Sequence, residues 1–308
     1  MGCSVNTALT TVGDLLERVF AVVGSMPEAR WILQANATVQ GWAQGQGDLW
    51  SRLDVEVPAS VERGVDEMVR RRQAGEPLQY VIGTWEFRSL EVRVDRRVLI
   101  PRPETETVVG CALEELAALA ARDRGRDQLI AADLGTGSGV IALSLAVEGP
   151  FHDGSTWIWA TDSSAGALSV ARDNLALAES RHGVPSGCVR LARGEWFEAL
   201  PTELNGSIGL IVSNPPYVSE SEWVGLDHEV RDFEPRSALV AGESGLEALE
   251  LLVREAPRWL SPGGSIVLEL APHQADPMSL MAQAVGFVDV RVRPDLAGRP
   301  RVLIGCLP

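Results

Sequence analysis

Apolar residues recur every three or four positions along the first quarter of the chain. Residues 8–72 show this spacing at Leu15, Leu16 and Val19 and repeat it later in the segment. A period of 3.6 residues places apolar side chains on one face of a helix, so the pattern predicts amphipathic helices. We therefore expect residues 1–74 to form a small N-terminal helical domain.

The pattern changes in residues 75–106. Two short apolar runs, at residues 80–83 and 90–94, predict the strands of a β-hairpin. Residues 100–106 (Ile-Pro-Arg-Pro-Glu-Thr-Glu) predict a stiff loop, because two prolines fix the backbone there. We expect this whole segment to be a linker between two domains.

Strand-like and helical patterns alternate from residue 107 onward. The predicted strands cover residues 129–134, 157–161, 188–192, 208–213, 265–270, 288–292 and 301–306. The predicted helices cover residues 108–119, 140–146, 165–178, 246–260 and 277–285. Such alternation is typical of a largely parallel sheet covered by helices, so we expect an α/β domain over residues 107–308.

The distribution of charge bears on the kind of substrate. The 308 residues carry a net charge of −15, and residues 101–308 hold 16 Arg against 29 Asp and Glu. Binding of nucleic acid depends on contacts between cationic side chains and phosphates. The acidic balance of the predicted α/β domain therefore disfavours a nucleic-acid substrate.

Cysteine and histidine residues are scattered along the chain. Cys3, Cys111, Cys188 and Cys306 form no Cys-x-x-Cys pair, and the four His are isolated, so we expect neither a disulfide framework nor a metal site.

No apolar stretch reaches the roughly 18 residues that a membrane span needs. The N-terminus lacks the basic segment and apolar core of a signal peptide, so we expect a cytoplasmic protein.

The segment Asn214-Pro215-Pro216-Tyr217 follows the apolar run at residues 208–213, which predicts a buried strand. Two prolines cannot continue a central strand, so the chain leaves the sheet at this point. The Asn214 amide and the Pro215 carbonyl suit the two hydrogens of a planar –NH2 group, and Tyr217 adds a flat apolar face. A plain turn after a strand has the same residues, so the neighbouring segments must decide between the two interpretations.

A glycine-rich segment, residues 133–139 (Asp-Leu-Gly-Thr-Gly-Ser-Gly), follows another predicted strand and opens a helix. Its spacing differs from the dinucleotide Gly-x-Gly-x-x-Gly pattern, and it has no P-loop Lys. Asp133 would repel a pyrophosphate but attract a cationic ligand, while Asp162, at the end of the next strand, is placed to bind ribose hydroxyls. A turn with two solvated carboxylates is the alternative, but the order of the elements favours a nucleoside site. A cationic nucleoside without a pyrophosphate indicates S-adenosylmethionine.

Five segments resemble known methyltransferases. Residues 133–139 resemble motif I of class I methyltransferases, and residues 214–217 resemble motif IV of those that methylate planar amino groups. Residues 100–106, 229–235 and 295–299 resemble the release factor glutamine methyltransferase family. The resemblance implies an α/β fold: a Rossmann-like class I methyltransferase sheet with a small N-terminal helical domain and a β-hairpin linker.

The resemblance also implies a reaction. The family uses S-adenosylmethionine to methylate the side-chain amide nitrogen (N5) of the glutamine in the Gly-Gly-Gln motif of class 1 peptide chain release factors. Asn214, Pro215 and Tyr217 would be catalytic, and with Pro216 they would bind the glutamine. The implied cofactor-binding residues are Gly135, Thr136, Gly137, Ser138, Gly139, Asp162, Trp196 and Asn214.

Several residues near the expected site have a structural alternative. Trp196 fits a core position as well as a place beside the adenine. Phe87 and Arg102 would lie at the linker edge of the site, but Phe87 also fits simple packing, and Arg102 also fits an ion pair within its own loop. Glu234 also fits a local ion pair.

Glu195 and the segment at residues 270–272 depart from the family pattern, which weakens the expectation for the adenine contacts.

Other functions also fit parts of the sequence. The chemistry of residues 214–217 suits an adenine or guanine amino-methyltransferase as well, and a cofactor-binding scaffold without activity is a third possibility. We expect a monomer with a protein substrate and with no nucleic-acid or membrane partner.

Overall fold

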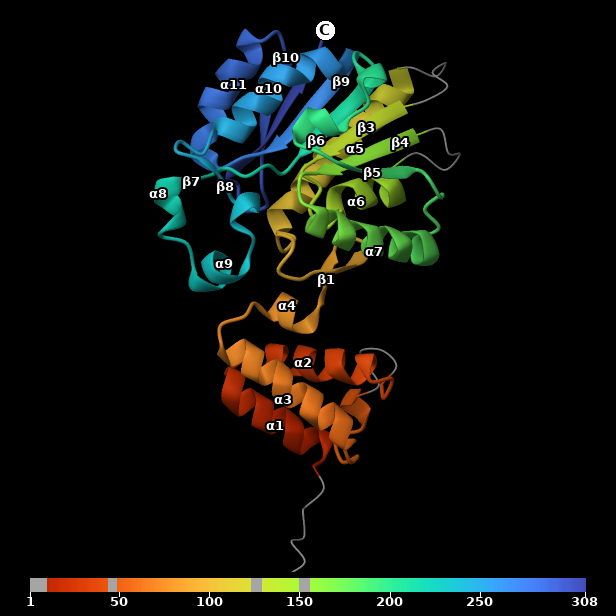
Figure 1. The fold of residues 1–308 in the computed structure, drawn as a ribbon, viewed down its shortest axis with the longest axis vertical. Helices are drawn as coiled ribbons and strands as arrows, with labels where there is room; N and C mark the ends of the chain where they lie inside the picture. The colour runs from red at the N-terminus through yellow and green to blue at the C-terminus, as the bar shows by residue number, and fades with distance from the viewer. Residues whose placement is uncertain (1–9, 44–48, 123–128, 150–155) are drawn as a thin grey trace, which may run out of the picture. The chain divides into compact units, whose positions relative to one another are not determined.

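The chain divides into two compact units. The computed structural model describes residues 10–43, 49–122, 129–149 and 156–308, so Cys3 lies outside the described residues. The first unit contains the chain up to Gly83 together with His228–Phe233, and the second contains residues 84–227 and 234–308. Figure 1 colours the first unit red and orange, apart from its helix α9 in cyan. No helix in the described part of the chain combines the length and the apolar character needed to cross a membrane.

The first unit is a bundle of helices. Its elements are α1 (Val12–Val23), α2 (Met26–Val39), a 3-10 turn (Leu49–Ser51), α3 (Ala59–Gln73), α4 (Leu78–Ile82) and α9 (His228–Phe233). Leu15, Val19, Ile32 and Val65 are buried in one apolar core, as the helical spacing predicted. The predicted helical region is therefore confirmed.

The predicted hairpin begins later than the sequence suggested. Residues 80–83 were expected to form its first strand, but α4 contains most of them, and the strands are β1 (Thr84–Phe87) and β2 (Leu90–Arg93). Gly83 ends α4 with a φ of 86°, a conformation that glycine adopts without strain. The Arg71 guanidinium also donates to the carbonyl oxygen of Tyr80 at 2.8 Å. This short apolar run therefore packs as a helical turn, which a short run does not distinguish from a strand.

The prediction of a stiff loop at residues 100–106 is correct only for residues 100–102. Helix α5 (Pro103–Arg122) begins inside it. Proline is favoured in the first helical turn, because its missing N–H would have no partner there. Glu104 and Glu106 occupy the same turn, where negative charge is stabilised by the helix dipole.

The second unit is built on a seven-stranded sheet. Its strands are β3 (Leu129–Leu134), β4 (Thr156–Asp162), β5 (Val189–Arg193), β6 (Ile208–Ser213), β9 (Leu260–Glu269), β10 (Val288–Pro294) and β11 (Pro300–Cys306). Their order is β10-β11-β9-β6-β3-β4-β5. Strands β9, β6, β3, β4 and β5 are parallel, β11 is antiparallel to β9, and β10 is antiparallel to β11. This sheet confirms the predicted class I methyltransferase fold.

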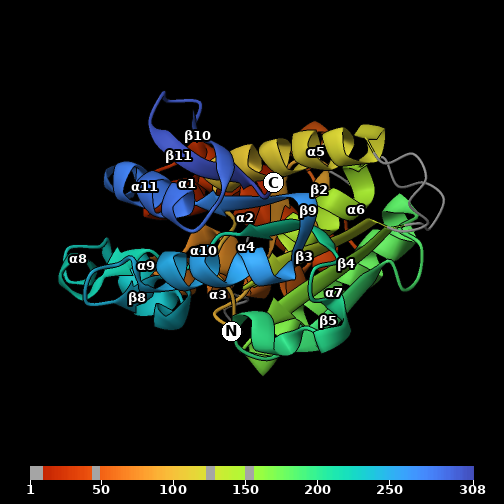
Figure 2. The same ribbon diagram turned by 90° about the horizontal axis from the view of Figure 1, so that it is seen from above.

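Helices cover both faces of the sheet. They are α5, α6 (Val140–Glu148), α7 (Ala165–His182), α10 (Glu247–Trp259) and α11 (Ala275–Ala284). A separate small pair of strands, β7 (Val218–Ser219) and β8 (Val240–Gly242), lies beside the short helix α8 (Glu220–Trp223). Figure 2 shows α5 and α6 on one face and α10 on the other. On the α10 face Phe197 stacks on Trp259 with ring centroids 5.7 Å apart.

One strand starts earlier than predicted, and the order of the strands marks the place of the site. Strand β9 begins at Leu260, earlier than the predicted residue 265, because Leu260 pairs with Ile208 before an irregularity in the register. The chain order also reverses at β3: β4 and β5 extend the sheet to one side, and β6 lies on the other. Ligands bind in open α/β sheets at the carboxyl ends of the strands beside such a reversal.

Candidate active site

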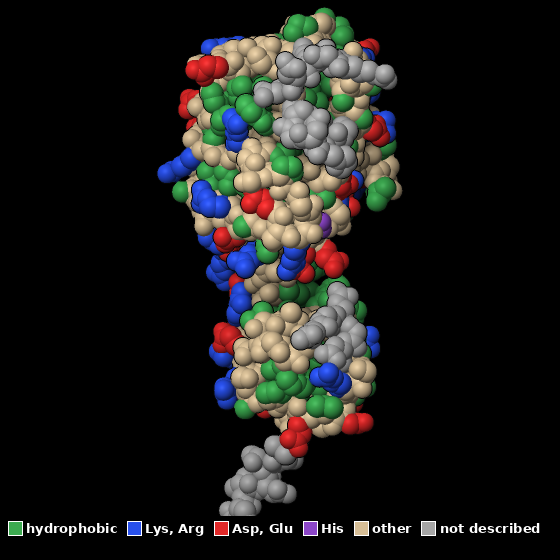
Figure 3. All heavy atoms as spheres, turned by 90° about the vertical axis from the view of Figure 1, so that its right-hand side faces the viewer, with side chains coloured by type: hydrophobic (Ala, Val, Ile, Leu, Met, Phe, Trp, Pro, Cys, Tyr) green, Lys and Arg blue, Asp and Glu red, His purple; other side chains and the backbone are tan. Residues whose placement is uncertain are grey.

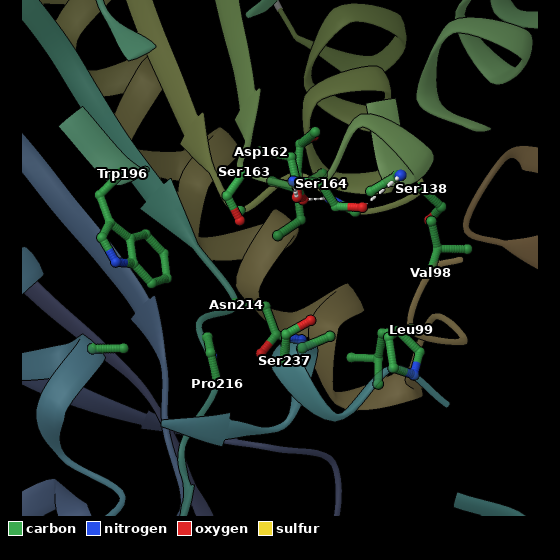
Figure 4. Close-up of a pocket in the computed structure, with 18 of the residues that line it drawn as sticks. Val98, Leu99, Ser138, Asp162, Ser163, Ser164, Trp196, Asn214, Pro216 and Ser237 are labelled. Carbon is green, nitrogen blue, oxygen red and sulfur yellow. Dashed lines mark hydrogen bonds between the residues drawn. The ribbon is translucent and has the colours of Figure 1, made fainter. Parts of the chain in front are cut away.

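A cavity of about 430 Å³ lies at the carboxyl ends of β3, β4 and β6. The glycine-rich segment follows β3, Asp162 ends β4, and Asn214 follows β6. Figure 4 shows Ser138 and Asp162 on one side of the open space and Asn214 and Pro216 across from them, with Trp196 at a third side. The structure therefore brings the separately predicted segments to one cavity.

Backbone groups of the glycine-rich segment form one wall of this cavity. Gly135, Thr136, Gly137 and Ser138 line it, whereas Gly139 does not and instead precedes the first residue of α6. The N–H groups of Gly135 and Thr136 donate to the carbonyl oxygen of Thr161 at 2.9 and 2.8 Å, which fixes the loop on β4. Gly135 has a φ of 75°, a conformation that favours glycine, while a Cβ there would meet the Trp196 ring at an ordinary contact distance of 3.4 Å.

Asp133 stabilises this loop by hydrogen bonds and does not line the cavity. Its side chain is fully buried and accepts hydrogen bonds from the Thr136 hydroxyl at 2.6 Å and from the Ala142 N–H at 3.1 Å. Burial raises the pKa of Asp133 from 3.8 to about 7. A direct attraction between this carboxylate and a cationic ligand, one of the expectations from sequence, therefore has no support in the geometry.

The raised pKa of Asp133 predicts a dependence of stability on pH. The folded protein holds this proton up to about pH 7, whereas the unfolded chain releases it near pH 3.8, so the stabilisation is complete below pH 3.8 and is lost as the pH rises to about 7. The free energy of unfolding should fall in this window by up to about 1.4 kcal/mol per pH unit. Urea unfolding of the wild type and of Asp133→Asn at several pH values measures the difference in slope. Equal slopes in the two proteins would contradict the assignment.

Asp162 is held as an acceptor at the cavity wall. Its Oδ2 accepts from the Gly137 N–H at 2.9 Å, and its Oδ1 accepts from the Ser164 N–H at 2.8 Å. Each carboxylate oxygen has further lone pairs, so both remain able to accept a hydroxyl hydrogen. Burial raises the pKa of Asp162, and the two N–H donors act against this rise.

Trp196 belongs to the cavity and to the core at once. Its ring lines the cavity and also packs against the apolar cluster beneath the sheet. Its φ of 47° is rare for a residue with a large side chain, and such strain persists where the surrounding structure requires it. Glu195, which departs from the family pattern, lines the same cavity.

The segment at residues 214–217 contributes alternate side chains to the cavity. Asn214 and Pro216 line it, whereas Pro215 is buried and Tyr217 lies behind the wall. The Asn214 Nδ2 donates to the Thr105 hydroxyl at 3.1 Å. The Tyr217 hydroxyl donates to Glu269 Oε1 at 3.2 Å.

Sequence reasoning missed the partners of these residues. Thr105 and Glu269 were not singled out: Thr105 lies in residues 100–106, which resemble the family, and Glu269 directly precedes residues 270–272, which depart from its pattern. Arg102 lines the cavity and pairs with the buried Glu234, so the alternative of an ion pair within its own loop, and that of a local ion pair for Glu234, do not hold. Glu234 also accepts from the Ile100 N–H at 3.1 Å. Phe87 is only 1% exposed and does not line the cavity, which supports its packing alternative.

The residues of the cavity fit S-adenosylmethionine. A Cβ at Gly137 would meet no atom within 4 Å, so open space lies beside the loop backbone where the methionine part would bind. Asp162 presents acceptors of the kind that bind ribose hydroxyls, and Trp196 presents a flat apolar face of the kind that suits an adenine. Among the described residues, no group of three or more His, Cys, Asp or Glu side chains is arranged to hold a metal ion.

Comparison with known proteins shows the family of the chain. The chain matches the family models of the PrmC N-terminal domain at residues 27–83 and of the methyltransferase small domain at residues 116–228. It is 39% identical to the release factor glutamine methyltransferase of Xylella fastidiosa (strain 9a5c), over 84% of this chain and 87% of that protein. The enzyme of the same name from Nitratidesulfovibrio vulgaris is 44% identical over 77% of this chain and 75% of that protein, and the one from Burkholderia pseudomallei is 37% identical over 90% of both. The chain belongs to the release factor glutamine methyltransferase family.

Proposed function

We propose that this protein transfers a methyl group from S-adenosylmethionine to the side-chain amide nitrogen of the glutamine in the Gly-Gly-Gln motif of class 1 release factors. The observation that carries the proposal is the position of Asn214. Its side-chain amide lines the same cavity as the glycine-rich loop and Asp162, which suit the methyl donor. The names of the relatives supply the identity of the substrate.

The role of Asn214 follows from the weakness of the nucleophile. An amide nitrogen reacts poorly because its lone pair is delocalised over the carbonyl group. Asn214 Oδ1 and the Pro215 carbonyl oxygen would each accept one hydrogen of the substrate –NH2. This arrangement favours a pyramidal nitrogen whose lone pair is directed into the cavity. The methyl group would leave the sulfur as the new N–C bond forms, and the nitrogen would then release one proton to solvent. No strong base is needed beforehand, because this proton becomes acidic during bond formation.

The remaining residues of the site act by orientation. Bound S-adenosylmethionine supplies a methyl group on a positively charged sulfur. Gly135, Thr136, Gly137 and Ser138 would bind its methionine part, and Asp162 would hold the ribose. Pro216 lines the wall on the side of Asn214 and would restrict the substrate side chain. Catalysis of this kind rests on alignment and on preorganised dipoles.

The proposal includes a protein substrate, a monomeric enzyme and a cytoplasmic location. The net charge of −15 supports a protein rather than a nucleic acid as the substrate. On the face shown in Figure 3, Arg side chains are interspersed with Asp and Glu side chains. The cytoplasmic location follows from the substrate, because class 1 release factors act in translation.

A methyl-transfer assay with three substrates tests the proposal. Purified enzyme and S-adenosylmethionine with a labelled methyl group are incubated separately with a class 1 release factor, DNA and RNA. We expect label on the release factor alone, and none when the glutamine of its Gly-Gly-Gln motif is replaced by alanine. Label on nucleic acid alone would support the amino-methyltransferase alternative, and label on no substrate would support a scaffold.

A further inference from the structure

A chain of hydrogen bonds leads from Asn214 into the interior of the second unit. The Asn214 Nδ2 donates to the Thr105 hydroxyl at 3.1 Å, and this hydroxyl donates to Glu269 Oε2 at 2.7 Å. Thr105 is 2% exposed and Glu269 is fully buried. Since Thr105 stands in the first turn of α5 and Glu269 ends β9, the chain joins three separate elements.

The direction of these hydrogen bonds follows from the chemistry of the groups. A threonine hydroxyl has one hydrogen to donate, and a carboxylate has none. The hydroxyl of Thr105 therefore gives its hydrogen to Glu269 and can only accept from Asn214. Asn214 must then present its Nδ2 to Thr105, which leaves Oδ1 at the other end of the planar amide. Within the described residues Oδ1 has no hydrogen-bond partner, so it is available to a ligand in the cavity.

The surroundings of Glu269 support its role as a double acceptor. Its second oxygen accepts from the Tyr217 hydroxyl at 3.2 Å. Burial and then the nearby Glu269 raise the pKa of Tyr217, so this hydroxyl keeps its hydrogen. Burial also raises the pKa of Glu269 itself, while the hydroxyl of Thr105 and the charge of Arg301 favour its ionised form, against a smaller effect of Glu104.

We propose that Glu269, acting through Thr105, fixes the Asn214 side-chain amide with Oδ1 toward the substrate –NH2, which makes Thr105 and Glu269 positioning residues for methyl transfer. The inference rests on the proposed function, because Oδ1 has its role only with an –NH2 substrate. An amide in the opposite orientation would present two donor hydrogens to the –NH2 group, and donors cannot accept its hydrogens. The hydrogen-bond chain removes that unproductive orientation.

A double-mutant cycle on the full-length enzyme tests this inference. Thr105→Val removes the hydroxyl with little change of shape, and we expect kcat for release-factor methylation to fall about tenfold or more, with cofactor affinity changed less than threefold. Thr105 also borders the cavity, but if it acts through Asn214 as proposed, the same substitution in an Asn214→Ala background should change kcat less than twofold. Thr105→Ser, which keeps a hydroxyl, should restore most of the activity.

Two further variants complete the design. Thr156→Val is the matched control, because Thr156 is equally buried in β4 and its hydroxyl has no hydrogen-bond partner among the described residues; its kcat should equal that of the wild type. If Thr105→Val does not fold, Glu269→Gln replaces it in the cycle. The amide introduced at position 269 can donate to the Thr105 hydroxyl. This hydroxyl can then donate its own hydrogen to Asn214 Oδ1, so the opposite orientation of the Asn214 amide becomes possible.

The outcomes separate this inference from the proposed function. A wild-type enzyme that methylates no release factor overturns both. A wild-type enzyme that is active, with variants at residues 105 and 269 that lower kcat by the same factor with and without Asn214, overturns the inference alone. Loss of cofactor affinity as the main effect of Thr105→Val would also overturn it. A kcat effect that disappears in the Asn214→Ala background supports it.

Discussion

Replacing Asn214 by alanine is expected to lower kcat for release-factor methylation by about 100-fold or more. Removal of a single preorganised hydrogen-bonding group at a reacting centre typically costs about 100- to 1,000-fold in rate. Cofactor affinity should change much less, because the glycine-rich loop and Asp162 form the opposite side of the cavity. Single-turnover kinetics with labelled cofactor measure the first quantity, and calorimetry with S-adenosylmethionine measures the second.

The Asn214 experiment has a matched control in the same unit. Asn205 lies on a turn outside the cavity, where its Nδ2 donates to the Thr202 carbonyl oxygen at 2.6 Å. Asn205→Ala should therefore leave kcat within about twofold of the wild-type value, as is usual for substitutions away from special features. An Asn214→Ala enzyme with near-normal kcat would refute the proposed arrangement of the –NH2 group.

Replacing Asp162 by alanine is expected to weaken S-adenosylmethionine binding by about 100-fold. Two hydrogen bonds from ribose hydroxyls to a carboxylate contribute roughly 3 kcal/mol together, which corresponds to about two orders of magnitude in Kd. The carboxylate also accepts from the N–H groups of Gly137 and Ser164, so its loss frees the loop that would hold the methionine part. Titration calorimetry measures the change directly.

The control for Asp162 is another acidic residue of the second unit. Asp173 is half-exposed, and its carboxylate lies 3.7 Å from the exposed Arg93 guanidinium. Asp173→Ala should leave the Kd within about twofold, because exposed ion pairs contribute little. If Asp162→Ala binds the cofactor as tightly as the wild type, then Asp162 serves only to hold the loop backbone.

Those parts of the fold and of the site that depend on local sequence could be predicted. Strands β3 and β6 were predicted with the observed bounds, because strands buried on both faces are continuous apolar runs. Asp162 and Asn214 were both predicted at the ends of strands, and they line one cavity because the ends of parallel strands share one edge of a sheet. Local pattern therefore sufficed to place the strands that end at the cavity.

Features that depend on distant partners could not be predicted. Thr105 and Glu269 are separated by 164 positions in sequence, and Arg102 and Glu234 by 132. No period or spacing relates such residues, since their partners depend on how complete elements pack. The assignment of His228–Phe233 to the first unit is of the same kind, because a six-residue helix carries too little pattern to indicate its neighbours.

Helix α9 limits the ways in which the two units can be separated by engineering. The chain enters the first unit a second time at His228 and leaves it at Phe233, and Glu229 pairs there with Arg72 at 2.7 Å. The next residue, Glu234, holds Arg102 at the cavity. A cut at Gly83 would therefore remove the packing partners of α9, which immediately precedes the residue that pairs with Arg102. The N-terminal helices alone therefore do not make up the first unit. An exchange of this unit between relatives would have to include residues 228–233.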